Sequence, residues 1–328
     1  MWREFARRHR TAISVVGTIL TIAALVYALA GKRQEFVDAL RGVTASVLAA
    51  TVLLQIVALL SRSEAWHLTI EAAGGTVARR VLFRASSMQV LGSVINGNLG
   101  VAMRIGALRR SSPDVAPQVP TLIAAEFPIL AVEASLAALA SFTLIAPLGI
   151  PWWAPVIAIA VLALVSAGLR HLAVNTEREL WKGLTVLRTS NHGSRVVCFV
   201  LVAVFAQIFR NWMLLHAVGV QASFFDAIAV LIALVTLSQL PVGPAAGAAA
   251  AVLILGRDGV AAAAAAGVLM TVTGTIGGLL FVSWAGADGL WIRLRARASA
   301  RSAASVAAPP PSPGDSRPPR GRRAGRSR

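Results

Sequence analysis

Long apolar segments are the feature of this sequence that most constrains its fold. A helix of roughly 20 apolar residues crosses the ~30 Å hydrocarbon core of a membrane, and six uninterrupted segments approach that length: Thr11–Ala30, Val43–Leu60, Thr121–Ala146, Trp152–Leu169, Val196–Val218 and Val260–Ala285. Charged residues make up only 14% of the chain, against about 25% in a soluble domain. The alternating strand pattern of outer-membrane barrels is absent. The sequence therefore predicts an all-α integral membrane protein.

Two further apolar stretches, Ala85–Met103 and Ala227–Gly256, are interrupted by residues that weaken or break helices. In the first these residues are Gln89, Gly92, Asn96, Gly97, Asn98 and Gly100, and in the second Pro241, Gly243 and Pro244. Proline removes a backbone donor and glycine weakens a helix, so both stretches are expected to unwind locally. Unwound backbone is tolerated at membrane depth only where protein buries it or water reaches it.

The distribution of Lys and Arg between the loops predicts the orientation in the membrane. Basic residues gather at the N-terminus, after the second span, after the first broken stretch, in the loop Arg170–Arg195 and in the tail, whereas Pro147–Pro151 and Gly219–Phe225 have none. All these clusters are cytoplasmic if each broken stretch enters and leaves the membrane by the same face. Three basic residues do not fit this topology, because it puts them on the outer side of the membrane: Lys32, Arg33 and Arg41. The predicted topology is six spans plus two re-entrant elements with both termini cytoplasmic, a transporter-like arrangement. Eight full spans are the alternative.

This topology divides the chain into a basic cytoplasmic N-terminus (1–10), a transmembrane domain (11–285) and a basic, Pro/Arg-rich tail (286–328). The first apolar run is longer than the roughly 7–15 residues of a secretory signal core, so it is predicted to remain as a span. The tail is predicted to be disordered and cytoplasmic. Its charge suits an anionic inner leaflet, although a solvated tail that only enforces the topology is the preferred explanation. The excess of Arg over Lys and the many alanines indicate a bacterial inner membrane.

Polar side chains inside the predicted spans are the candidates for a functional site. Glu126 and Glu133 share one span, and Gln207, Arg210 and Asn211 form a polar stripe on another. Charges at membrane depth are costly, so we expect Glu133 and Arg210 to lie together. Either they form a pair that locks two helices, or Arg210 holds an anionic lipid head group and Glu133 is its counter-charge in the empty state.

Glycine motifs predict close helix packing rather than a substrate path. The segments Gly243–Gly247 and Gly274–Gly278 both have the G-x-x-x-G spacing, which lets helices approach closely in lipid.

Enzyme signatures are missing. The sequence has no phosphate-binding loop, no serine nucleophile elbow and no zinc-protease motif, and its five histidines are scattered. A single cysteine, Cys198, cannot form an internal disulfide. We therefore expect no catalytic residues, no cofactor and no metal. The net charge of +17 is concentrated at the predicted cytoplasmic ends, which argues against a nucleic-acid partner.

Two segments resemble motifs in the transmembrane region of lysylphosphatidylglycerol synthases. Residues 96–104, NGNLGVAMR, resemble the family pattern P-G-R-x-G-E-x-x-R, and residues 241–248, PVGPAAGA, resemble P-x-x-P-G-G-x-G. The matching residues are Gly97, Gly100, Arg104, Pro241 and Pro244. Most charged positions differ, because the family's Arg is Asn98 here and its Glu is Val101.

The resemblance implies a flippase-like membrane domain without the soluble aminoacyl-transferring domain, so lysylation is not expected. If the two broken stretches, entering from opposite faces, form a shared midplane site, Gly97, Gly100 and Arg104 should lie near Pro241–Gly247. Arg104 would then be a cytoplasmic-side phosphate contact and Arg210 a deeper one. The leading hypothesis is a protein that binds or translocates a lipid-linked substrate, a phospholipid or glycolipid, between leaflets. The alternative is a non-transporting accessory subunit of a lipid-modifying transferase.

Overall fold

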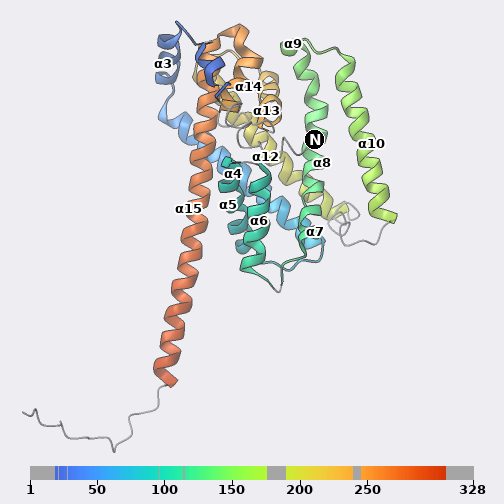
Figure 1. The fold of residues 1–328 in the computed structure, drawn as a ribbon, viewed down its shortest axis with the longest axis vertical. Coiled ribbons are helices and arrows are strands. Elements are labelled where there is room, and N and C mark those ends of the chain that lie inside the picture. The colour runs from blue at the N-terminus through green and yellow to red at the C-terminus, as the bar shows by residue number, and fades with distance from the viewer. Residues whose placement is uncertain are drawn as a thin grey trace, which may run out of the picture. The chain divides into compact units, whose positions relative to one another are not determined.

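The computed structural model describes residues 19–20, 22–27, 29–95, 97–113, 115–175, 190–238 and 245–307, and every regular element in these ranges is helical (Figure 1). The main helices are α3 (Arg33–Arg41), α4 (Ala45–Ala72), α5 (Arg79–Ile95), α6 (Gly97–Ser111), α7 (Val119–Ala124), α8 (Phe127–Ala140), α9 (Ile145–Leu148), α10 (Trp153–Asn175), α12 (Ser190–Ala217), α13 (Phe224–Ser238), α14 (Ala246–Leu255) and α15 (Val260–Ala307). Short 3₁₀ turns, Ser141–Leu144 and Gly256–Asp258, precede α9 and α15.

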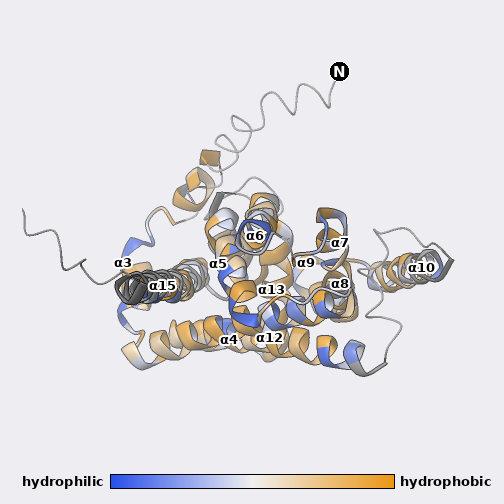
Figure 2. Ribbon diagram, turned by 90° about the horizontal axis from the view of Figure 1, so that it is seen from below, coloured by the Kyte–Doolittle hydropathy of each residue, from blue (hydrophilic) through white to orange (hydrophobic). Residues whose placement is uncertain are grey.

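Four described segments are long and apolar enough to cross a membrane: Ala45–Ala72, Val119–Leu148, His192–Ala217 and Val260–Ile292. Large apolar side chains lie exposed on these segments and on α10, as expected where lipid rather than water is the solvent. Figure 2 shows the hydropathy of the residues along these helices. The prediction of an α-helical membrane protein is therefore confirmed at this level. The predicted span Trp152–Leu169 corresponds to a shorter apolar helix, Trp153–Gly168, and most of the predicted span Thr11–Ala30 lies outside the described residues.

An antiparallel pair, α4 and α12, is the axis of the transmembrane unit. Small side chains, Ala58 on α4 with Ala203 and Ala206 on α12, pack together at the middle of this pair. Two larger cores lie at its two ends. In one, the N-terminal half of α4 meets the C-terminal half of α12, and in the other, the C-terminal half of α4 meets the N-terminal half of α12.

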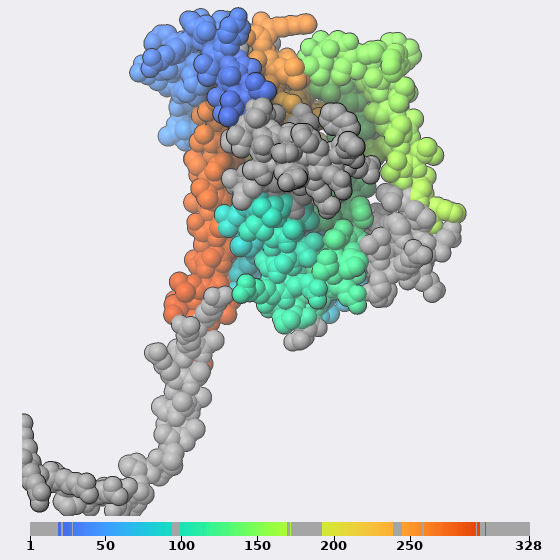
Figure 3. All heavy atoms as spheres, in the orientation of Figure 1, coloured from blue at the N-terminus to red at the C-terminus, as the bar shows by residue number. Residues whose placement is uncertain are grey.

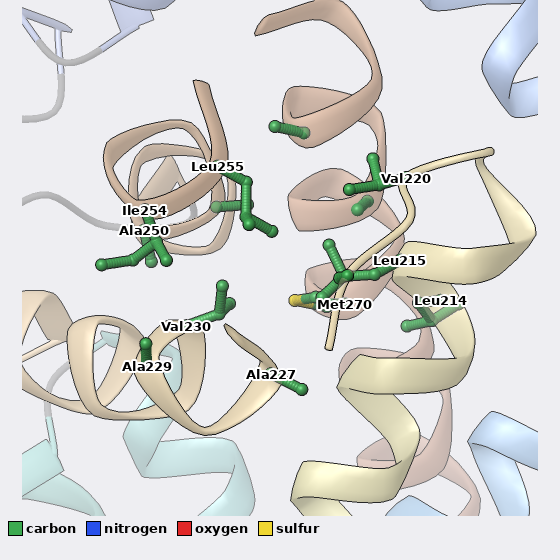
Figure 4. Close-up of a cluster of buried hydrophobic side chains, with 14 of the residues drawn as sticks. Leu214, Leu215, Val220, Ala227, Ala229, Val230, Ala250, Ile254, Leu255 and Met270 are labelled. Atoms are coloured by element: carbon green, nitrogen blue, oxygen red, sulfur yellow. The ribbon is translucent and has the colours of Figure 1, made fainter. Parts of the chain in front are cut away.

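The core at the first end joins large apolar side chains to many alanines, and we call it the apolar core. It joins the C-terminal end of α12 to α13, α14 and the start of α15 (Figure 4). Leucine and methionine side chains such as Leu214, Leu215 and Met270 fill the space beside alanines such as Ala250. Alanine lets these helices approach closely, as small residues do in membrane interfaces.

The core at the second end contains charges among its apolar side chains, and we call it the charged core. It joins the C-terminal half of α4 to α5, α6, α7 and the N-terminal end of α12. Trp66, Leu68, Leu82 and Leu108 are buried in it, together with the charged side chains of Arg104 and Glu126. Figure 3 shows the outer surface of α6 and the chain leading from it to α7.

Each interrupted stretch of the sequence forms a helical hairpin. Helix α5 ends at Ile95 and α6 begins at Gly97, and the two lie so close together that a Cβ on Gly92 would be 2.6 Å from the Cα of Gly100. Helices α13 and α14 also pack on one another, and both belong to the apolar core (Figure 1). At ~1.5 Å per residue, helices of this length fall short of the ~30 Å hydrocarbon core. The turn of the second hairpin, with Pro241, Gly243 and Pro244, lies outside the described residues.

The predicted span Thr121–Ala146 is broken after one and a half turns. Helix α7 ends at Ala124 and α8 begins at Phe127 with Pro128 in its first turn. Proline at this position cannot donate to the carbonyl of Ala124 and clashes with it, which ends α7. Glu126 therefore sits at the break instead of within a continuous helix.

The chain divides into two compact units, Met1–Ala285 and Gly286–Arg328. Residues 286–307 of the second unit are helical, as the last part of α15. This corrects the expectation that the whole segment 286–328 lacks regular structure. The error arose because proline, which stops helices, begins only at Pro309, whereas the Ala- and Arg-rich segment before it is a good helix former.

Candidate functional site

Three side chains on one face of α4 define the candidate site, and we call them the α4 stripe: Gln55, Arg62 and Trp66. Spacings of seven and four residues place them above one another on a helix. The stripe spans about 16 Å at ~1.5 Å per residue. We call each stripe residue, together with the side chains that it contacts, a level of the stripe. Each of the three levels contains one arginine, and the three arginines come from different helices.

The Trp66 level holds a buried ion pair. Arg104 of α6 pairs with Glu126 at the α7–α8 break, and the Arg104 guanidinium carbon lies 3.9 Å from the Trp66 ring centroid. The Arg104 side chain is only 1% exposed. The ion pair and the cation–π contact together compensate a charge that is costly to bury. Arg104 was predicted to contact a substrate phosphate, but here it joins α6 to α4 and to the α7–α8 break.

The Arg62 level holds a second ion pair, which is partly open. The Arg62 guanidinium forms a fork on the Glu133 carboxylate of α8, with Nη1 2.9 Å from Oε1 and Nη2 donating to Oε2 at 3.1 Å. These side chains are 33% and 25% exposed. The predicted pair of Glu133 with Arg210 is therefore wrong, since the partner of Glu133 is Arg62. Forked geometry of this kind also suits a phosphate group.

The Gln55 level holds Arg210 of α12. Arg210 is buried, and its guanidinium donates to the side-chain oxygens of Gln55 and Asn211, the latter at 3.3 Å. Both partners are neutral. Gln207 lies on the same face of α12, one turn before Arg210, and is half-buried. The polar stripe predicted on α12 thus exists, and Gln55 is the partner that the sequence did not predict.

A further ion pair lies outside the stripe, where α4 ends. Arg79, at the start of α5, donates from Nε to Oε2 of the buried Glu64 at 2.7 Å. This hydrogen bond raises the pKa of Arg79 above its ordinary value. His67 Nδ1 lies 3.8 Å from the same carboxylate. The pair fixes the α4–α5 connection and leaves Glu64 unavailable to the stripe.

Arg62 and Trp66 were not predicted as site residues, because the second span was expected to end at Leu60. Helix α4 continues to Ala72 since neither glycine nor proline occurs between Ser61 and Ala73. That missing break was the available signal. The prediction instead followed the basic residues after Leu60, which assigned Arg62 to a cytoplasmic loop.

The glycines predicted as hinges instead mark close helix contacts where the structure describes them. Gly97 begins α6, and a Cβ on Gly100 would be 2.7 Å from the Gln89 carbonyl oxygen of α5. A Cβ on Gly247 of α14 would be 2.5 Å from the carbonyl oxygen of Gly267 on α15. The expected meeting of the two breaks depends on Pro241–Pro244 and lies outside the described residues. Among those residues no group of three or more His, Cys, Asp or Glu side chains could hold a metal ion.

Comparisons with family models, with curated proteins and with solved structures find no match for this chain.

Proposed function

We propose that the chain is a flippase-like membrane protein that binds an anionic lipid head group along the α4 stripe and moves it between leaflets. The observation that carries this proposal is a row of three arginines along one face of α4. Arg210 contacts Gln55, Arg62 belongs to α4 itself, and Arg104 contacts Trp66. A row of cationic levels along a membrane helix offers successive contacts to a phosphate.

The Arg62 level is the proposed entry point for the head group. Its fork is partly exposed, and a phosphate that replaced the Glu133 carboxylate would give Arg62 an equivalent set of charge-assisted hydrogen bonds. Such an exchange keeps the arginine paired, and the displaced Glu133 carboxylate, which is 25% exposed, gives up its cation. Glu133 is then the counter-charge of the empty site, the role expected of it, but with Arg62 in place of Arg210.

The Arg104 level has a supporting role in this proposal. Arg104 and Glu126 are both buried and already paired, so they hold α6 and the α7–α8 break against α4. They hold the Trp66 level of the stripe in place while Arg62 exchanges its anionic partner. The Gln55 level, about 10 Å further along α4 from Arg62, is the next contact for a head group moving inward.

Reconstitution of the full chain into liposomes tests this function. Vesicles with trace fluorescent phosphatidylglycerol or phosphatidylcholine are treated with an impermeant quencher, and the fraction that becomes accessible is followed over time. The proposal predicts faster exposure of phosphatidylglycerol than in protein-free vesicles, and faster than for phosphatidylcholine. Equal rates with and without protein for both lipids would reject it and favour the accessory-subunit hypothesis.

A further inference from the structure

Arg210 is a buried cation without an acidic partner among the described residues. It contacts only the neutral oxygens of Gln55 and Asn211, whereas Arg62 and Arg104 each meet a glutamate. A buried charge that lacks a counter-charge is strongly disfavoured, and more so at membrane depth. A bound anion would supply the negative charge that the described residues around Arg210 do not.

Two hydrogen-bond donors at this level also lack an acceptor. Arg210 Nε and Asn211 Nδ2 are buried, and neither has a hydrogen-bond partner in the structure. Asn211 is fully buried and Arg210 nearly so. Since both unsatisfied atoms are donors, the group that satisfies them must be an acceptor, and next to a cation an anionic acceptor binds most strongly.

Arg210 lies against α15 at a position that has no side chain. A Cβ added to Gly274 of α15 would lie 3.3 Å from Arg210 Nη1 and would meet no other atom outside the local backbone of α15 within 4 Å. Gly274 is half-buried, so the Arg210 guanidinium is close to the surface of α15 at this point.

This level also lies between the two hairpins. Along α15, Gly267 contacts α14 at Gly247, and Gly278 contacts α5 at Val90. Gly274 is about 10 Å from the first contact and about 6 Å from the second. Along α15, the site thus lies between the contact with one hairpin and the contact with the other.

The structure assigns an anion-binding site to Arg210 and Asn211, beside Gly274. The ligand is a compact anion with acceptor oxygens or a halide, supplied either as a free ion or as the phosphate of a lipid head group. The lipid source rests on the proposed function, whereas the anion site itself does not. A protein that moves no lipid could still bind phosphate or chloride here.

Thermal unfolding of the full chain in neutral detergent tests the site. The protein, whose eight tryptophans report unfolding, is placed in sodium gluconate and titrated with sodium chloride or sodium phosphate at constant ionic strength. A parallel series uses dihexanoyl phosphatidylglycerol, with dihexanoyl phosphatidylcholine as its control. An anion that binds only the folded state raises Tm in a saturable manner.

Variants locate the effect. Arg210→Gln should weaken the apparent affinity by about tenfold or more, the size expected for losing charge-assisted hydrogen bonds. Arg41→Gln, at an exposed arginine of α3 outside the α4 stripe, should keep the wild-type affinity for the free ions. If Arg210→Gln does not fold, Gly274→Ala serves in its place, because its methyl group would narrow the space next to Nη1, whereas Gly286→Ala has nothing within 4 Å and is the matched control.

The outcomes separate the two sources and the two proposals. Saturable stabilisation by chloride or phosphate that is lost in Arg210→Gln or Gly274→Ala supports a free-ion site, even if lipid translocation fails. Stabilisation by the phosphatidylglycerol probe alone, lost in the same variants, supports the site with a lipid as its ligand. No saturable shift with any probe, or equal shifts in wild type and these variants, overturns the inference.

Discussion

The charged core and the apolar core occupy equivalent positions at the two ends of α4 and α12, yet they are built by different means. Each encloses a helical hairpin, α5–α6 in one and α13–α14 in the other. The apolar core packs hydrophobic side chains and small helix contacts and has Arg210 with its neutral partners on its border, whereas the charged core buries the ion pair of Arg104 and Glu126 and has the Arg62–Glu133 pair on its border.

The difference indicates which end can change its contacts. Close packing of alanine and glycine gives a single well-fitted arrangement, because there is no alternative partner for the contacts it makes. An arginine of an ion pair can exchange its carboxylate for a phosphate and keep charge-assisted hydrogen bonds of the same kind. The end with the Arg62–Glu133 pair can therefore change its contacts, whereas the close glycine and alanine contacts at the other end form a fixed support beside the Arg210 level.

The largest effect should come from breaking the buried pair of the charged core. Glu126→Gln leaves Arg104 buried without a counter-charge, which costs about 3–5 kcal/mol. We expect a large drop in thermal stability and folded yield in detergent. The double variant Arg104→Gln/Glu126→Gln removes both charges and should recover part of the loss. Losses that simply add in the double variant would show that the two side chains do not interact.

An intermediate effect is expected from crowding the apolar core. Gly267→Ala places a methyl group against Gly247 and the Cα of Ala248, backbone atoms that cannot move aside easily. Overpacking of this kind costs about 1–3 kcal/mol. The control is Gly256→Ala, whose new Cβ would have its nearest neighbour at 3.6 Å. If both variants unfold at the same temperature, α14 and α15 are not in the close contact described.

The smallest effect on stability is expected at the Arg62 level. Because Arg62 and Glu133 are partly exposed, Glu133→Gln should cost only about 1 kcal/mol or less. The same unfolding measurement compares it with Glu126→Gln. A loss as large as that of Glu126→Gln would make this pair a structural lock and would remove the reason to assign it to a binding site.

Much of the fold follows from local patterns, and the departures have identifiable causes. The apolar blocks predicted helices that became α4, α12 and α15, and the break at Asn96 predicted the division between α5 and α6. Pro128 was present in the sequence, but the apolar composition around it concealed the α7–α8 break. The apolar composition of a segment predicts that it can cross a membrane, but a single proline within it can interrupt the backbone hydrogen bonds of the helix.

The candidate site was harder to predict, because it depends on which helices meet. Arg210 and Glu133 were recognised as intramembrane charges from their positions in the chain. Their partners, Gln55 and Arg62, lie on α4, and no spacing within the sequence relates α4 to α8 or α12. Opposite charge was the only available guide, and it selected the wrong partner for each.

The most direct test of the central claim, that the α4 stripe carries an anionic head group, is lipid translocation by the neutral variant Arg62→Gln/Glu133→Gln. This variant keeps side chains of similar shape and should retain close to wild-type stability, since both charges of a partly exposed pair are removed together. Losing charge-assisted contacts of about 1.5–3 kcal/mol should slow phosphatidylglycerol exposure in liposomes by about tenfold or more. Translocation of phosphatidylglycerol at the wild-type rate by the folded variant would contradict the account.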